Sequence, residues 1–168
     1  RDESVSPSRT PLLDLTPMLK LLAWADAADR FTRYGEGHDL ARLLGSAKPP
    51  HQRQRASREV SQIAKKMGSA SGQLLEMAQG MNLVRTFGVL EQAAKLQGTL
   101  SELDLSESAA SPFRQVLEPV AALAGSLALA EPDESATASL ERQRALILWY
   151  TDHGQYVQAA TLGREWLV

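Results

Sequence analysis

The sequence contains no cysteine and few of the residue types that favour β-sheets. Without cysteine the chain has no disulfides, no thiolate nucleophiles and no cysteine-ligated metal sites. Isoleucine and valine together supply ten of the 168 residues, whereas leucine and alanine supply 50. Because unbranched side chains lose little rotamer freedom in helices, whereas β-branched ones favour strands, this ratio predicts an all-α fold.

The chain also lacks a strong net charge and any long apolar run. Its formal charge of -2 excludes a globally basic nucleic-acid binder, although local basic patches remain compatible with it. The most apolar run, residues 119–130, is too short to cross a bilayer. Residues 1–10 are polar and lack the apolar centre of a secretory signal. We therefore expect a cytoplasmic protein with no membrane partner, an expectation that the missing cysteines support.

Apolar residues recur at helical spacing along most of the chain, between breaks marked by glycine and proline. We expect helices over residues 17–34, 39–44, 60–78, 83–94, 112–127, 140–152 and 156–167. The last two form an αα-hairpin. The predicted fold is a compact all-α bundle of about six or seven helices. Residues 1–11 are expected to be a disordered tail or linker from an upstream domain, and residues 12–168 a single helical domain.

Two kinds of sequence signal mark the starts and the ends of the predicted helices. Thr16 and Ser111 each precede a proline, which is typical of a helix start with a hydroxyl N-cap. Glycine is expected to end helices at Gly35 and to separate two of them at Gly80. Because the chain begins with Arg1 and not with methionine, we expect it to be a piece of a longer protein.

The few aromatic residues gather near the two ends of the chain. We expect five of them to pack together and to join the first helix to the final hairpin. The alternative is an exposed platform on which RNA bases stack. The five are Trp24, Trp149, Tyr150, Tyr156 and Trp166.

One pair of residues has a spacing with catalytic meaning. Arg33 precedes His38 by five positions, and an arginine four to six residues before a histidine is the signature of HEPN-type ribonucleases. In such chemistry the histidine moves the proton of an attacking ribose hydroxyl, and the arginine stabilises charge on the phosphoryl oxygens. The favoured alternative is an arginine that satisfies carbonyls at a helix end and a histidine on the surface. The three histidines of the chain are scattered, and their spacing indicates no metal site.

A basic stretch follows the second predicted helix. Residues 48–66 hold six lysines and arginines against one acidic residue. Opposite the apolar stripe of the long helix, these side chains would form a basic ridge able to neutralise RNA phosphates without reading bases. A solvated helix face preceded by a basic loop is an equally good interpretation. The candidate RNA-binding residues are Arg53, Arg55, Arg58, Lys65 and Lys66.

Two segments of the chain carry a family resemblance. The opening has LDLTP at 13–17 and WADAADRF at 24–31, and the ending has LILWY at 146–150, GQY at 154–156 and REWLV at 164–168. Both are similar to the helical region of the CRISPR-associated DxTHG-motif family, the ancillary proteins of type III systems. The middle of the chain carries no assignable motif.

The resemblance implies a specific architecture. Such proteins join a CARF domain, which binds cyclic oligoadenylate, to a helical HEPN domain that cleaves single-stranded RNA as a homodimer without a cofactor. This chain resembles the HEPN-like part alone. In the family, an Arg-Asn…His catalytic motif follows the segment that resembles Arg164–Leu167, whereas this chain ends at Val168. The implied function is a domain of an antiviral endoribonuclease whose catalytic motif lies outside this chain.

A second hypothesis comes from another functional class. The chain is then a non-catalytic helical interaction module whose closing hairpin imitates a tetratricopeptide-like unit. The two hypotheses differ in what they bind, because the first predicts RNA contact and the second predicts a protein partner for which RNA does not compete.

Overall fold

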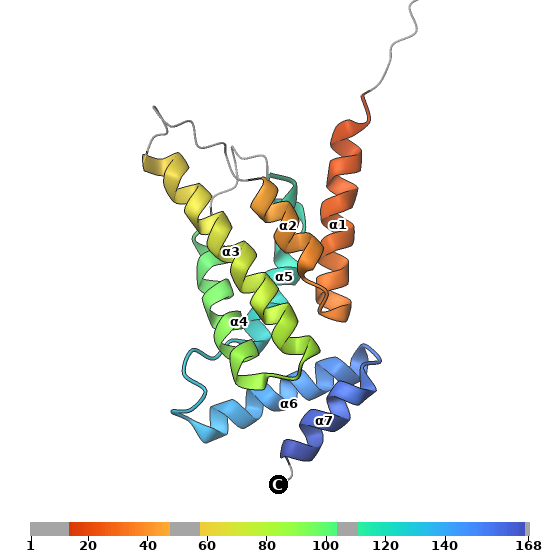
Figure 1. Cartoon of the computed structure of the whole chain (residues 1–168), viewed down its shortest axis with the longest axis vertical. Coiled ribbons are helices and arrows are strands. Elements are labelled where there is room, and N and C mark those ends of the chain that lie inside the picture. Colours follow the sequence, from red (N-terminus) through yellow and green to blue (C-terminus); the bar gives the residue numbers. More distant parts are fainter. Residues whose placement is uncertain (1–13, 48–57, 104–110, 167–168) are drawn as a thin grey trace, which may run out of the picture.

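The computed structural model describes residues 14–47, 58–103 and 111–166. Within these ranges the chain forms seven α-helices and one short 3-10 helix and contains no strand, so the predicted all-α fold is confirmed (Figure 1). The elements are α1 (Thr16–Tyr34), α2 (His38–Ser46), α3 (Arg58–Asn82), α4 (Thr86–Ser101), η1 (Ser111–Gln115), α5 (Leu117–Leu127), α6 (Ala136–Asp152) and α7 (Tyr156–Trp166).

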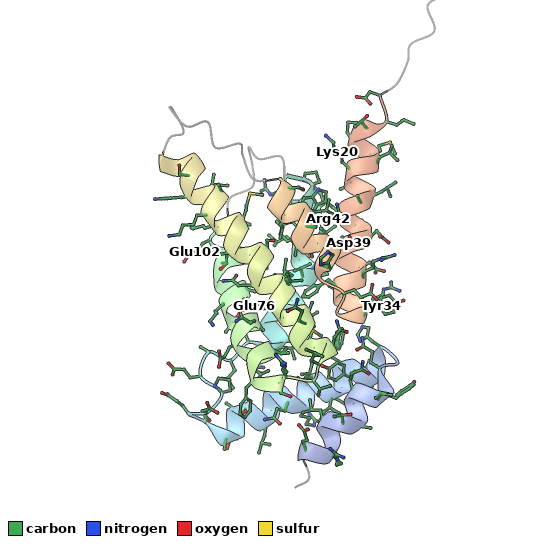
Figure 2. The ribbon with its side chains drawn as sticks, in the orientation of Figure 1. Lys20, Tyr34, Asp39, Arg42, Glu76 and Glu102 are labelled. Carbon is green, nitrogen blue, oxygen red and sulfur yellow. The ribbon has the colours of Figure 1, made fainter. Side chains whose placement is uncertain are left out.

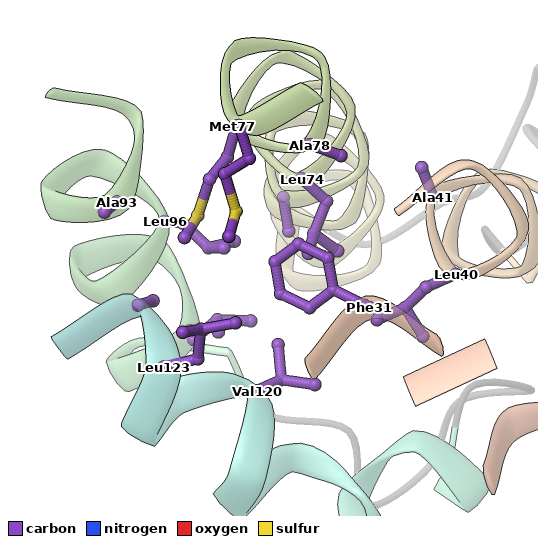
Figure 3. Close-up of a cluster of buried hydrophobic side chains, with 14 of the residues drawn as sticks. Phe31, Leu40, Ala41, Leu74, Met77, Ala78, Ala93, Leu96, Val120 and Leu123 are labelled. Atoms are coloured by element: carbon purple, nitrogen blue, oxygen red, sulfur yellow. The ribbon is translucent and has the colours of Figure 1, made fainter. Parts of the chain in front are cut away.

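An antiparallel pair, α3 and α4, forms the centre of the fold. Helix α2 packs on α3, α5 packs on α4, and the α6–α7 hairpin lies across the lower end in Figure 1. The cluster of core residues in Figure 3 lies between α1, α2, α3, α4 and α5, and the side chains that these helices contribute to it are buried. Phe31 of α1 is central to this cluster, beside Leu40 of α2 and Leu74 of α3. The helices are therefore held together mainly by burial of apolar surface.

Two glycines shape the turn between α1 and α2. Gly35 has a φ of 70°, in the left-handed region that glycine adopts without cost, and its N–H donates to the carbonyl oxygen of Phe31 at 2.9 Å. Gly37 lies so close to α3 that a Cβ there would be 2.8 Å from the Cβ of Ala78 and 3.0 Å from the carbonyl oxygen of Leu74. The first glycine ends α1 and the second lets α2 begin against α3.

Hydrogen bonds attach the α6–α7 hairpin to the rest of the fold. The buried hydroxyl of Tyr150 donates to the carbonyl oxygen of Met81 at 2.6 Å, and burial raises the pKa of this phenol well above its ordinary value. The indole Nε1 of Trp149 donates to the carbonyl oxygen of Thr32 at 3.1 Å. These bonds place the hairpin against the C-terminal ends of α3 and α1, so the predicted αα-hairpin is present and docked.

Several predicted boundaries are wrong for identifiable reasons. Gly80 does not separate two helices but lies inside α3, where a Cβ would be 2.8 Å from Cγ2 of Val89. The chain turns at residues 83–85 instead, through Val84 with a φ of 54°, and α4 begins at Thr86. The predicted helix 39–44 extends to Ser46. Close packing, and not helix termination, explains the glycine.

Thr16 and Ser111, the two hydroxyl residues that precede prolines, lie at helix starts but do not act as the expected N-caps. At α1 the Asp14 carboxylate accepts the N–H of Thr16 at 2.9 Å, and hydrogen bonds from Thr16 lower the pKa of that carboxyl. Thr16 is thus the first helical residue and not the N-cap. At Ser111 the chain forms η1 and then α5, in place of the single helix predicted over residues 112–127.

The predicted aromatic cluster is also wrong. Trp24 lies beside Phe113 of η1, with ring centroids 5.4 Å apart, because this part of α1 packs against η1 and α5. Trp149 packs instead beside Tyr150. Tyr156 is 67% exposed, and the side chain of Trp166 lies outside the described residues. Within the described ranges, the hydrogen bonds between α1 and the hairpin lie at the C-terminal end of α1.

Candidate nucleic-acid interface

A groove of about 490 Å³ runs between α3 and α4 and contains three lysines. Lys65 and Lys66 enter it from α3, and Lys95 enters it from α4. We call it the lysine groove. Its other lining residues are mostly polar or small: Gln62, Ser69, Gln73, Ala94, Gly98, Thr99 and Glu102.

The groove follows from the helical period of the two helices. On α3, residues 62, 65, 66, 69 and 73 are spaced by three or four positions and share one face. The buried side chains of α3, which include Met67, Leu74 and Met77, belong to the core. Ala94 and Gly98 line the groove from α4. Small residues of α4 leave room between the two helices, and lysines from both walls make the concave surface positively charged.

Ion pairs restrain two of the three ammonium groups, and only weakly. Lys66 Nζ lies 3.1 Å from Glu102 Oε2 and also donates to the Glu102 carbonyl oxygen at 3.1 Å. Lys95 Nζ lies 3.9 Å from Glu91 Oε2, and Lys65 forms no ion pair within the described residues. Exposed pairs of this kind contribute about 0–1 kcal/mol, so a phosphate oxygen can replace their acidic partners.

Gln73 supplies an unused hydrogen-bond acceptor in the same groove. Its Oε1 atom is buried and has no hydrogen-bond partner in the described part of the chain. A buried acceptor without a partner costs about 1–3 kcal/mol. If the Gln73 amide rotated toward the groove, a ligand hydroxyl or amino donor would remove that cost, whereas the lysines would bind the anionic groups of the ligand. A nucleotide chain carries both kinds of group.

The structure brings together some of the predicted RNA-binding residues. Lys65 and Lys66 line the groove. Arg53 and Arg55 lie outside the described residues, as does the side chain of Arg58, although Arg58 begins α3. The basic ridge is therefore described only in its helical half.

Sequence reasoning missed Lys95. It lies far along the chain from the basic stretch, and only the packing of α4 on α3 brings it to the same groove. The sequence held one weak signal, because Lys95 follows Glu91 by four positions on a helix, but that spacing favours a solvated surface pair.

The Arg33–His38 pair lies elsewhere. Arg33 is exposed at the end of α1, where its Nε contacts Asp29 Oδ1 at 2.7 Å, and His38 is the exposed first residue of α2. Figure 2 shows Asp39 on the α1–α2 side of the molecule and Glu102, at the lysine groove, on the α3–α4 side. The structure does not test whether Arg33 and His38 are catalytic residues.

The described residues lack two other kinds of feature. No group of three histidine, aspartate or glutamate side chains is placed to hold a metal ion in the part of the chain that the structure describes. Among the same residues, no helix combines the length and the apolar character that crossing a membrane requires.

A family match defines the class of protein to which the chain belongs, a helical domain of a CRISPR-associated protein. A family model described as CRISPR-associated protein MJ1674, second domain, matches residues 20–123. This match covers more than half of the chain, so the chain belongs to that family. The matched range includes every residue of the lysine groove. No curated protein and no solved structure matches the chain.

Proposed function

We propose that this chain is the RNA-contacting helical domain of a type III CRISPR ancillary effector. The lysine groove holds the phosphates of single-stranded RNA, and the contact carries no base sequence preference because phosphates are the same at every nucleotide. The observation that supports this function best is the convergence of Lys65, Lys66 and Lys95 on one concave surface.

The finer parts of the proposal come from the family resemblance. The domain is HEPN-like, works as a homodimer beside an upstream CARF domain that binds cyclic oligoadenylate, and contributes to metal-independent RNA cleavage in antiviral defence. In the family that the chain resembles, the catalytic arginine and histidine follow a segment like Arg164–Leu167, and within the given sequence Arg33 with His38 is the candidate pair. Cleavage by the longer protein that survives a chelator and is lost in R33A/H38A would assign that pair.

RNA binding is tested by equilibrium titration of a labelled single-stranded RNA at low salt. The triple variant K65A/K66A/K95A removes the three groove cations, and K20A/R42A/R164A removes the same charge from exposed positions outside the groove. We expect the groove variant to lose about 10-fold to 100-fold in affinity and the control to lose much less. Equal losses in the two variants would show that only net charge matters and would contradict the site.

A second function, a protein-interaction module, is favoured by a different pocket. A cavity of about 650 Å³ where α4 meets the α6–α7 hairpin is lined by apolar residues such as Phe87 and Leu140 together with polar ones, Arg85, Gln143 and Glu165 among them. Phe87 is 47% exposed there. This function predicts that a partner protein co-purifies with the chain, that F87A releases it, and that RNA does not compete.

A further inference from the structure

The first two turns of α1 project from the fold and expose apolar side chains. Residues 14–23 are all exposed, and burial on α1 begins only at Trp24 (Figure 1). Four side chains in this segment, each 56–64% exposed, are Leu15, Met18, Leu19 and Leu22. Met18 and Leu22 have the apolar helical spacing that is typical of a buried face, yet both side chains are exposed.

These four residues form one stripe that faces away from the core. Their spacing of three, four and seven positions aligns them on one side of the helix. At 100° per residue, the stripe lies opposite the side that carries the buried residues Trp24, Ala27, Ala28 and Phe31. The core of this chain therefore does not cover the stripe.

The same side of α1 becomes charged after Leu22. Two i,i+4 ion pairs occupy it, with Arg30 Nε 3.3 Å from Asp26 Oδ2 and Arg33 Nε 2.7 Å from Asp29 Oδ1. The apolar stripe thus has a sharp boundary. A partner that slid further along α1 would bury these charges, which is costly unless they are matched.

The stripe is self-complementary when one copy is reversed against another. Reversal about the midpoint between positions 18 and 19 places Leu15 opposite Leu22 and Met18 opposite Leu19. This is the property that a two-fold symmetric interface requires, because each copy offers the same patch. Four side chains per copy, each 56–64% exposed, make a small contact surface, of the size class that associates weakly and reversibly.

We propose that the projecting turns of α1 are a two-fold interface at which a second copy of this chain packs antiparallel. The partner copy supplies the packing without which two turns of helix are marginal in water. The inference rests on the homodimer of the proposed function and assigns its surface. It uses no residue of the lysine groove and is tested without RNA, so its failure and a failure of RNA binding are distinguishable.

Sedimentation equilibrium of the full chain over a range of concentrations tests for the dimer. An interface at the lower size limit predicts reversible association with a dissociation constant of about micromolar order. We expect L19K to raise that constant at least about 10-fold, because it places an ammonium group in the seam. The matched control L148K changes another exposed leucine, on α6, and is expected to leave the constant unchanged. Circular dichroism confirms that both variants remain folded.

Disulfide trapping tests the direction of packing. Because the chain has no native cysteine, only the introduced cysteines can form disulfides. A mixture of L15C and L22C chains should form the mixed disulfide faster than either homodisulfide, because like positions are then about 10 Å apart along the helices. A monomer at every concentration, an L19K dimer as tight as the wild type, or faster homodisulfides would each overturn the proposal.

Discussion

Replacing Gly37 by alanine isolates the effect of one methyl group on the turn between α1 and α2. Gly37 has a φ of -84°, which alanine adopts without strain, so the change adds only a steric contact. The new Cβ would lie 2.8 Å from the Cβ of Ala78, 3.0 Å from the carbonyl oxygen of Leu74 and 3.2 Å from Cδ2 of Phe31. None of these atoms is the free end of a flexible chain. We expect the free energy of unfolding to fall by about 1–3 kcal/mol.

Gly72 provides the matched control. It lies within α3, and a Cβ added there has no atom within 4 Å. Alanine at this position should raise the free energy of unfolding by about 0.5–1 kcal/mol, because it lowers the backbone entropy of the unfolded chain and favours the helix.

Urea titration followed by circular dichroism measures both changes. With a slope of about 1–3 kcal/mol per molar urea, the midpoints of the two variants should move in opposite directions and differ by about 0.5–4 M. A G37A variant as stable as the wild type would refute the close approach of α2 to α3. It would also remove the structural reason for the second glycine between Arg33 and His38.

Three further changes test other parts of the account. Y150F removes the hydroxyl that bonds to the Met81 carbonyl and should cost about 1–3 kcal/mol at neutral pH. Because burial holds the Tyr150 pKa above its unfolded value near 10, the stability of the wild type should fall as the pH rises above about 10, and more steeply than that of Y150F. G80A should destabilise the fold by about 1–3 kcal/mol, and V89A should offset part of that loss in the double variant; additive losses would contradict the contact. Q73L should gain up to about 2 kcal/mol of stability and lose RNA affinity, whereas unchanged affinity would remove Gln73 from the site.

The order of the helices could be predicted from the sequence because each helix carries its own periodic apolar pattern and many of its own breaks. Gly35 and the hairpin near Gly154 are local signals, and the structure shows a positive φ at both. Gly80 had the same appearance in the sequence but serves a contact with Val89, which lies on another helix. A local pattern cannot distinguish a glycine that ends a helix from one that lets two helices approach.

The candidate site could be predicted only where it is contiguous in the chain. Lys65 and Lys66 belong to a basic run, whereas Lys95 joins them through the packing of α4 on α3. The same limit applies to α1, whose apolar residues Met18 and Leu22 match the helical period but face away from the core. Periodicity indicates that a face is apolar, and tertiary packing decides whether this chain covers it.

Photocrosslinking tests the central claim most directly. Single-stranded RNA that carries a photoreactive uridine would be bound to the unmodified chain at low salt, irradiated and digested, and the linked peptides identified by mass spectrometry. We expect the crosslinks to fall in α3 and α4 around the lysine groove and to disappear in K65A/K66A/K95A. Crosslinks confined to α1, or to the pocket at Phe87, with the same yield in that variant, would contradict the account.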